Sequence, residues 1–276
     1  MTLSVVTNLS SIRAQRNLSK ATSSLSGHIE KLSSGLRINR ASDDAARSAI
    51  SAQMAANLTG LKQAERNSND AISMIQTAEG GMNEVSGIVT RMRELSVQAA
   101  NSGTMDSTER GYLDQEFQLL ESELNRIVEV TEYSGVKLIN GDQSGGIDFQ
   151  VGFSNSANDR ISVSISSVNG TTLGLNDENL SSATGAAAAL TALDTALQSV
   201  STARASLGAT QNRLSMTISN LGSMYENSAD SLSRLRDVDV AEETAAFTRT
   251  KILTDAATSV LASANTIPQS ALKLLS

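Results

Sequence analysis

A heptad repeat over residues 190–235 constrains the fold of this chain more than any other feature. Fourteen positions follow one another in alternating steps of three and four without a slip, and ten of them carry Leu, Ile or Val. Such a seam indicates a helix with coiled-coil-like packing, about 70 Å long at 1.5 Å per residue. Its polar occupants Arg204 and Gln211 are typical of residues that set register or extend their heads to solvent.

Three further helices are predicted before this seam. The first covers residues 7–33 and stops at Gly35, because glycine readily adopts the left-handed conformation that ends helices. The second covers residues 43–100, with Ser42 as its cap and two Asp residues in its first turn. The third begins at a capping box formed by Asp106 and the Glu three residues later.

Residues 131–180 have a different character, because glycines there separate short apolar runs. Apolar and polar residues alternate over 147–151 and again over 161–165, and a period of two is typical of β-strands. We expect one or two β-hairpins in this region, with Asn169 and Gly170 as a tight turn.

The composition excludes several kinds of functional site. The chain has no cysteine and a single histidine, His28, so disulfides, thiolate sites and multi-histidine metal sites are ruled out. His28 lies among polar residues and is expected to be solvated. No nucleophile, base and acid set is visible and no His-Glu-x-x-His motif occurs, so we predict a protein that is not an enzyme and uses no cofactor.

The charge and hydropathy of the chain also limit its partners. A net charge of −7 argues against binding to nucleic acid. No segment approaches the roughly 18 apolar residues of a membrane span, so membrane insertion is not expected. Residues 1–40 are nevertheless basic, with six Lys or Arg against Glu30 alone.

Both ends of the chain indicate amphipathic helices whose apolar faces need a partner. Apolar residues three and four apart share one face of a helix. We expect these faces to pack against each other and against further copies of the chain, which indicates a self-assembling protein rather than a catalyst. The residues expected to carry this packing are Val5, Leu9, Ile12, Leu18, Leu25, Ile29, Leu32, Ile252, Leu253, Val260, Leu261, Ile267, Leu272 and Leu275.

A terminal helix on its own gains too little from its apolar side chains to offset the conformational entropy of ordering it. We therefore expect the termini to be disordered in a lone chain and to become ordered on assembly.

Six blocks of sequence, spread in order over most of the chain, resemble bacterial flagellin. The first, Leu-Ser-Ser-Gly-Leu-Arg-Ile-Asn-Arg-Ala-Ser-Asp-Asp-Ala-Ala, is similar to the N-terminal signature of that family. The blocks occupy residues 32–46, 67–80, 91–99, 131–138, 207–214 and 234–239.

The resemblance implies a mainly α fold, a long antiparallel helical coiled-coil bundle with a small β-hairpin region and with domains that are discontinuous in sequence. Residues 1–44 and 236–276 would form a terminal inner-tube coiled-coil domain. Residues 45–235 would form a helical outer-tube domain with β-hairpins at about 135–180. Only about 50 residues, 140–189, occupy the place of the family's variable outer domains, which we expect to be absent.

The resemblance also implies a function and a set of partners. The chain would be exported unfolded through the flagellar type III apparatus and would polymerise with itself into the extracellular flagellar filament used for swimming. Implied partners are paralogous flagellins, a filament cap protein, a hook–filament junction protein and an export chaperone. The family's flagellin-sensing Toll-like receptor would contact Arg91, Leu95 and Glu116, with Leu95 mainly a packing residue.

Two alternatives remain at this point. A hook–filament junction protein shares the terminal architecture, although such proteins usually carry proline after the paired Asp where this chain has Ala45. A membrane-active amphipathic segment fused to a coiled coil would also explain the basic start. Abundance in a sheared-surface preparation tests the first alternative, and liposome flotation of residues 1–45 tests the second.

Overall fold

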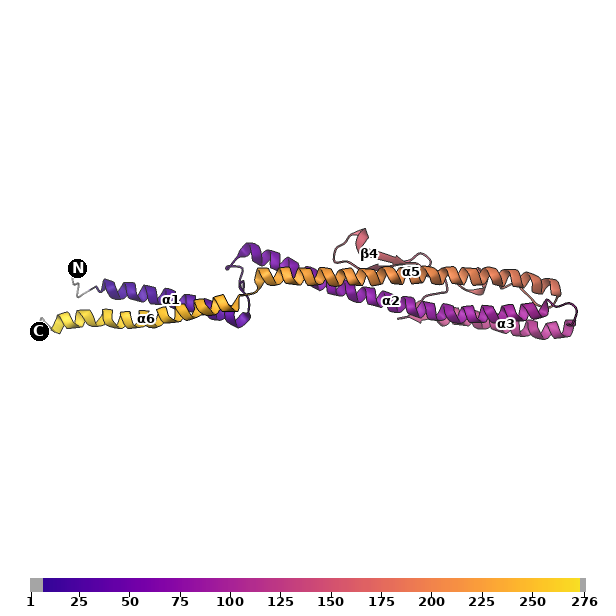
Figure 1. Cartoon of the computed structure of the whole chain (residues 1–276), viewed down its shortest axis with the longest axis horizontal. Helices are drawn as coiled ribbons and strands as arrows, with labels where there is room; N and C mark the ends of the chain where they lie inside the picture. Colours follow the sequence, from indigo (N-terminus) through magenta and orange to yellow (C-terminus); the bar gives the residue numbers. More distant parts are fainter. Residues whose placement is uncertain (1–6, 274–276) are drawn as a thin grey trace. The chain divides into compact units, whose positions relative to one another are not determined.

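The computed structural model describes residues 7–273 and confirms the mainly α-helical fold (Figure 1). The helices are α1 (Leu9–Ser34), α2 (Ala45–Ala99), α3 (Ser107–Val130), the short α4 (Gly170–Leu173), α5 (Ala183–Arg236) and α6 (Val240–Lys273). The strands are β1 (Glu132–Tyr133), β2 (Val136–Lys137), β3 (Ile147–Gln150) and β4 (Arg160–Val163), and a 3-10 turn covers Ala157–Asp159. Within residues 7–273, none of the helices combines the length and the hydropathy that crossing a bilayer requires.

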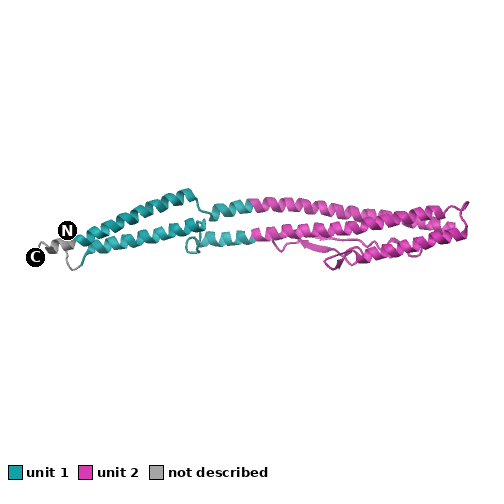
Figure 2. Cartoon of the chain, turned by 90° about the horizontal axis from the view of Figure 1, so that it is seen from below, with its two compact units in different colours: residues 1–56, 227–276 teal, residues 57–226 magenta. Residues whose placement is uncertain are grey.

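The chain divides into two compact units, of which the first is built from two separate segments of the sequence and the second from one continuous segment (Figure 2). Unit 1 contains the residues up to 56 and those from 227 onward, and unit 2 contains residues 57–226. The domain boundaries that the resemblance implied, at 44/45 and 235/236, lie nearer the chain ends than the unit boundaries of the structure, at 56/57 and 226/227. The reason is that α2 and α5 each run through a unit boundary, so both helices contribute to both units.

Unit 2 is a bundle with a continuous aliphatic core. Its parts of α2 and α5 run antiparallel. Two ion pairs show this, since Arg93 pairs with Asp194 while the earlier Glu79 pairs with the later Arg204. α3 turns back along α2 and begins at the predicted capping box, in which Asp106 accepts hydrogen bonds from the backbone of Thr108 and Glu109. One cluster of 31 buried apolar residues fills this unit, and a second cluster contains three.

One row of the predicted α5 seam is buried, and the other row is shifted. Positions 193, 200, 207, 214 and 221 are all buried, as a heptad row should be. The second buried row contains Ala189, Ala196 and Ala203 rather than the expected Leu190, Leu197 and Arg204, which are only half-buried. Small side chains on this row let the neighbouring backbone approach closely, so the larger residues sit at the edge of the contact.

Two β-hairpins occupy the region that the sequence assigned to them. β1 and β2 pair antiparallel around Ser134 and Gly135, which both have positive φ angles (51° and 81°). Two such residues are characteristic of a type I′ turn. β3 and β4 pair antiparallel in a register that joins Ile147 to Val163 and Gln150 to Arg160.

Two local predictions were wrong, and each error has a physical reason. Asn169 does not form a hairpin turn: its side chain caps α4 by accepting a hydrogen bond from the backbone N–H of Thr172 (2.7 Å). Ser42 does not cap α2, because Asp44 accepts from the backbone N–H of Arg47 (2.9 Å) in that role. Asn and Asp serve both turns and caps, so sequence alone does not distinguish the two.

Candidate assembly interface

The two terminal helices of unit 1 form an antiparallel pair, which we call the terminal hairpin (Figure 1). At one end the Asn8 side-chain amide donates to the carbonyl of Ala264 (2.8 Å), and this residue also caps α1 by accepting from the N–H of Ser11. At the other end His28 Nδ1 lies 2.6 Å from Glu243 Oε1. These contacts join segments from opposite ends of the sequence, so each terminus depends on the other for its placement.

The terminal hairpin has almost no core of its own. In the described part of unit 1, the buried apolar residues are Ala14, Ile38 and Ala264, of which two are alanines. Apolar side chains on α1 and α6 instead face solvent, with exposed fractions from 46% to 63%. They are Leu9, Ile12, Ile29, Val240, Ile252, Leu253 and Val260.

The structure places the predicted packing residues on this uncovered surface or at its edge. Leu9, Ile12, Ile29, Ile252, Leu253 and Val260 are exposed, whereas Leu18, Leu25, Leu32 and Leu261 are half-buried. Val5 and Leu275 lie outside the described residues. Ile267 and Leu272 lie within α6, but their side chains lie outside the description. The sequence did not single out Val240, because the predicted stripe began later in the helix.

An apolar cavity of about 340 Å³ opens between the two helices. Small residues line it: Ala14 and Ala21 from α1 face Ala256 and Ala257 from α6, with Leu253 at the edge. Two alanine-lined faces leave space that their own side chains do not fill. An apolar side chain from another molecule is the kind of group that fits such a cavity.

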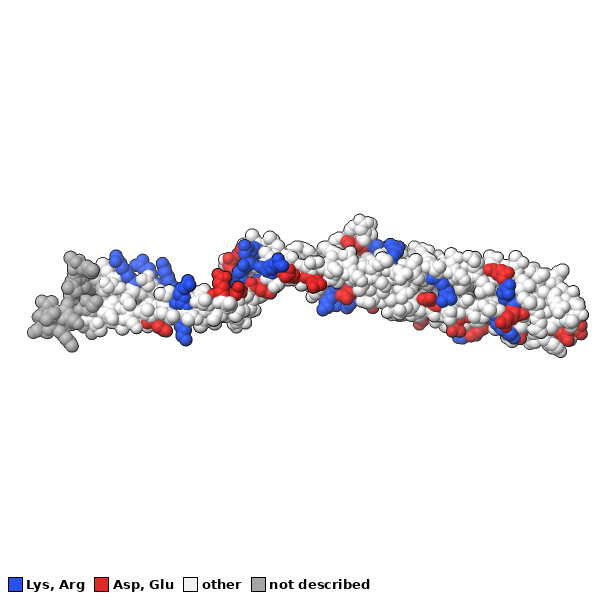
Figure 3. All heavy atoms as spheres, in the orientation of Figure 1, with Lys and Arg blue, Asp and Glu red and all other residues white. Residues whose placement is uncertain are grey.

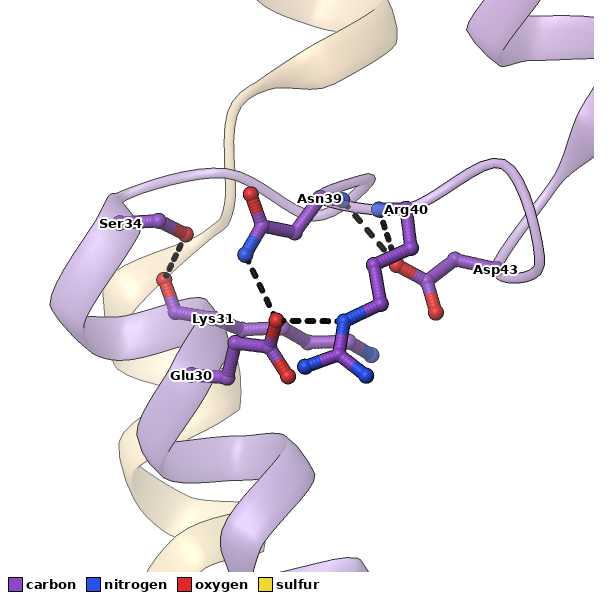
Figure 4. A network of polar contacts seen from close by, with 6 residues as sticks. All are labelled: Glu30, Lys31, Ser34, Asn39, Arg40 and Asp43. Atoms are coloured by element: carbon purple, nitrogen blue, oxygen red, sulfur yellow. Dashed lines mark hydrogen bonds and ion pairs between the residues drawn. The ribbon is translucent and has the colours of Figure 1, made fainter.

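The segment between α1 and α2, residues 35–44, is held by a dense polar network, and we call it the connector (Figure 4). One carboxylate oxygen of Glu30 accepts from the Asn39 side chain (2.9 Å) and from Arg40 Nε (2.8 Å). Asp43 accepts from the backbone N–H groups of Asn39 (3.1 Å) and Arg40 (2.9 Å). These backbone hydrogen bonds lower the pKa of the Asp43 carboxyl below its ordinary value.

The connector also ties the N-terminal segment to the end of α5. Backbone hydrogen bonds run from Arg37 to Arg236 (2.7 Å) and from Val238 to Gly35 (3.0 Å). The Arg37 guanidinium donates to the carbonyls of Arg234 (3.2 Å) and Leu235 (2.8 Å). The last carbonyls of a helix lack partners within the helix and favour a cation, so Arg37 supplies what the end of α5 requires.

Charge is unevenly distributed on the terminal hairpin, and Figure 3 shows the basic side chains gathered along α1. Arg13, Arg16 and Lys20 are all exposed there. Glu242 and Glu243 lie in the first turn of α6, where the helix dipole favours carboxylates.

Within the described residues, no group of three or more His, Cys, Asp or Glu side chains is arranged to hold a metal ion.

The structure corrects the expectation that His28 is solvated. Its side chain is only 23% exposed, and its partner Glu243 is 13% exposed. The polar neighbours of His28 along α1 gave no sign of this contact, because Glu243 lies 215 positions away in sequence.

In unit 2, two of the three residues predicted to contact a receptor form a surface cluster. Arg91 on α2 pairs with Glu116 on α3 (2.8 Å) and with Glu94 (3.0 Å). These hydrogen bonds, that to Glu116 foremost, raise the pKa of Arg91. Leu95 is 1% exposed, because it packs in the core of the bundle, so this structure does not present it to a partner.

Comparisons with known proteins cover nearly the whole chain. A family model for the bacterial flagellin N-terminal helical region matches residues 5–144, and one for the bacterial flagellin C-terminal helical region matches residues 190–275. A flagellin of Halalkalibacterium halodurans is 44% identical over 272 residues, covering 97% of this chain and 98% of the relative. A flagellin of Bacillus subtilis is 39% identical over 300 residues, with the same two coverages. The crystal structure of Bacillus cereus flagellin is 30% identical, with a TM-score of 0.50, over 56% of this chain and 88% of that one.

Proposed function

The chain belongs to the bacterial flagellin family, so it is a structural subunit of the extracellular flagellar filament and not an enzyme, and we propose that it polymerises through the uncovered apolar surface of the terminal hairpin. The observation that carries this proposal is the contrast between the two units. Unit 2 buries 31 apolar residues in its main cluster and leaves nine large ones exposed, whereas the described part of unit 1 buries only three and leaves seven large ones exposed on α1 and α6.

Burial of these side chains between neighbouring copies supplies the driving force. Covering a Leu, Ile or Val side chain contributes about 1.5–3 kcal/mol relative to leaving it in water. Exposed residues occur along both helices, from Leu9 to Ile29 on α1 and from Val240 to Val260 on α6. A single neighbour covers one side of such a pair, so the arrangement favours several neighbours around each hairpin. A helical array of copies provides them.

The proposal includes partners that act before and during assembly. An export chaperone would cover the apolar face of α6 until the chain leaves the cell through the type III apparatus, in an unfolded state. The small core of unit 1 supports this for the terminal helices, because few buried contacts must be broken there, whereas unit 2 would have to be exported before its larger core forms. A cap protein at the growing tip, a junction protein at the base and paralogous flagellins would contact the same terminal surface or the edges of unit 2.

An innate receptor contact on unit 2 is part of the proposal in a reduced form. The Arg91–Glu116 cluster is exposed and charged, and supports a polar contact of this kind. Leu95 is left out of that contact because its side chain is buried.

Seeded polymerisation tests the central proposal. Purified chain is mixed with sheared filament fragments and examined by sedimentation and electron microscopy. We expect filaments to extend from the seeds above a critical concentration. A chain that stays monomeric at all concentrations, despite a folded unit 2 by circular dichroism, would contradict the proposal.

Amide exchange tests whether assembly orders the termini. In a dilute monomer we expect fast exchange over residues 9–34 and slow exchange over the core part of α2, from Ala71 to Leu95. In filaments both segments should be protected. Equal protection of both segments in the monomer would show that the terminal hairpin is stable without neighbours.

A further inference from the structure

One face of α1 carries cations that form no ion pair within the described residues. We propose that the lone chain binds to the surface of anionic lipid bilayers through this face, which we call the basic row. Its members are Leu9, Ile12, Arg13, Arg16 and Lys20. This binding goes beyond the filament role proposed above, because it concerns the chain before it polymerises.

The basic row lies on a different face of α1 from the residues that pack toward α6. The packing face is buried or half-buried and has steps of three and four: Ala14, Leu18, Ala21, Leu25, His28 and Leu32. Arg13, Arg16 and Lys20 have the same spacing one position earlier, so they share a second face, and all three are exposed.

Two large apolar side chains belong to the same exposed face. Leu9 and Ile12 each lie four residues before an arginine of the row, and residues four apart in a helix are neighbours on its surface. Their side chains are 61% and 46% exposed. The face therefore combines positive charge with apolar surface, as amphipathic helices that lie on membranes do.

The positive charge of this face is not balanced within its own helix. Glu30, the one acidic residue of α1, is bound to Arg40 of the connector. Figure 3 shows the basic side chains along α1 with no acidic side chain among them in that view. Three positive charges are thus available to an anionic partner.

The terminal hairpin of another copy offers too little negative charge to neutralise the row. Within residues 7–266, α6 adds Arg249 and Lys251 to the exposed cations that form no ion pair. The exposed carboxylates of the two helices that form no ion pair are only Glu242 and Asp255. Because buried cations without partners are unfavourable, an extended anionic surface matches the row better than a second hairpin does.

An anionic bilayer satisfies both kinds of side chain on this face. Its headgroups attract Lys and Arg, whereas Leu and Ile enter the boundary between headgroups and acyl chains. The apolar stems of Lys and Arg can lie along that boundary while their charged ends reach the headgroups. No helix within residues 7–273 is long and apolar enough to cross a membrane, so the contact is with the bilayer surface.

Flotation of the full chain with vesicles, in the absence of filament seeds, measures this binding. The vesicles contain phosphatidylcholine alone or phosphatidylcholine with about one-third phosphatidylglycerol. We expect the chain to float with the anionic vesicles and to stay in solution with the neutral ones. Raising the salt concentration to about 0.5 M should release it, because salt screens exposed charges.

Amide exchange on the same samples locates the contact. Residues 9–34 should exchange fast in the dilute monomer and more slowly once anionic vesicles are added. The core part of α2, from Ala71 to Leu95, should show the same exchange with and without vesicles, because it is already buried.

A triple variant tests the residues of the row. Each Lys or Arg near an anionic surface changes the partition coefficient about fivefold, so three change it about a hundredfold. Arg13→Gln, Arg16→Gln and Lys20→Gln together should therefore lower binding about a hundredfold. Arg13→Lys with Arg16→Lys keeps the charge and should retain the binding, which separates the effect of charge from a loss of folding.

The matched control removes the same charge from unit 2. Lys62→Gln, Arg66→Gln and Arg213→Gln replace three exposed cations outside the hairpin, so this variant should bind vesicles like the unmodified chain. Equal loss of binding in the two triple variants would overturn the assignment to α1.

Three further results would also overturn the proposal. They are no binding to anionic vesicles, equal binding to neutral and anionic vesicles, and binding to soluble polyglutamate as tight as to anionic vesicles. The last would show that the row takes an acidic polypeptide rather than a bilayer. Because the assay contains no seeds, a failure to polymerise would count against the proposed function alone.

Discussion

At the scale of single residues, a substitution at the exposed Ile12 can test assembly without disturbing folding. Ile12 on α1 is 46% exposed, so a charged side chain there remains hydrated in the lone chain. In the filament the same charge would be buried without a partner, which is strongly unfavourable. We predict that Ile12→Asp raises the critical concentration at least about tenfold, while thermal unfolding of unit 2 followed by circular dichroism is unchanged.

The matched control for this change is Gln15→Asp. Gln15 is exposed on the same helix but is polar, so its substitution adds the same charge without removing an apolar contact. It should affect assembly much less. Near-normal filaments from Ile12→Asp would mean that this position still faces solvent after polymerisation.

Asp43 provides a second residue-scale prediction, concerning pH. The backbone N–H groups of Arg40 and Asn39 lower the pKa of its carboxyl below the ordinary 3.8. The folded connector therefore favours the ionised form. Its contribution is complete above that ordinary value and is lost as the pH falls through the lower folded value. In a carboxyl-detected NMR titration, Asp43 should titrate at a lower pH in the full chain than in a peptide of residues 37–46. Equal midpoints would show that the connector turn does not persist in solution.

At the scale of elements, α5 has two possible sets of core-facing residues: the set expected from the heptad pattern and the set that the structure buries. The heptad pattern treats Leu197 and Leu207 alike, but the structure buries Leu207 (1% exposed) and leaves Leu197 half-buried. We predict that Leu207→Ala lowers the free energy of unfolding by about 2–5 kcal/mol, because it leaves a cavity in a packed core. Leu197→Ala should cost clearly less, since Ala196 and Ala203 fill the second buried row. Urea unfolding of both variants measures this, and equal losses would support the register expected from sequence.

The same elements show which parts of the fold could be predicted. The limits of α1 and α3 follow from local chemistry, because Gly35 and Asp106 act through atoms only three or four residues away. The seam of α5 was predictable as a helix but not in its second row. Alanine is apolar enough for a core and common enough on surfaces, so the pattern favoured the larger Leu190 and Leu197.

The candidate interface was predictable from its apolar residues and not from its polar ones. Apolar residues such as Leu9 and Ile12 can be recognised from sequence, because residues three or four positions apart share one face of a helix. The contacts of His28 with Glu243 and of Arg37 with the carbonyl of Leu235 join residues 215 and 198 positions apart. Nothing in the local sequence marks either partner, and only the fold brings them together.

At the scale of the whole molecule, the two units differ in what they need from their surroundings. Unit 2 buries 31 apolar residues in its main cluster and is built to be stable by itself. Unit 1 buries three in its described part and exposes seven on α1 and α6. One chain thus combines a unit that can fold by itself with terminal helices whose apolar surface is covered by other copies, as a subunit of a polymer requires.

Truncation tests this division directly. Deleting residues 1–30 removes most of α1, and deleting residues 245–276 removes most of α6, so either change leaves the remaining terminal helix without its partner. Because the clusters of unit 2 contain no residue from the deleted segments, we predict that each truncated chain is a soluble monomer whose unit 2 unfolds cooperatively, at nearly the same urea concentration as in the full chain. Size-exclusion chromatography with light scattering and urea unfolding provide the measurements. Filaments from either truncated chain would show that unit 2 alone carries the polymerising surface, and loss of cooperative unfolding would show that the body depends on the ends.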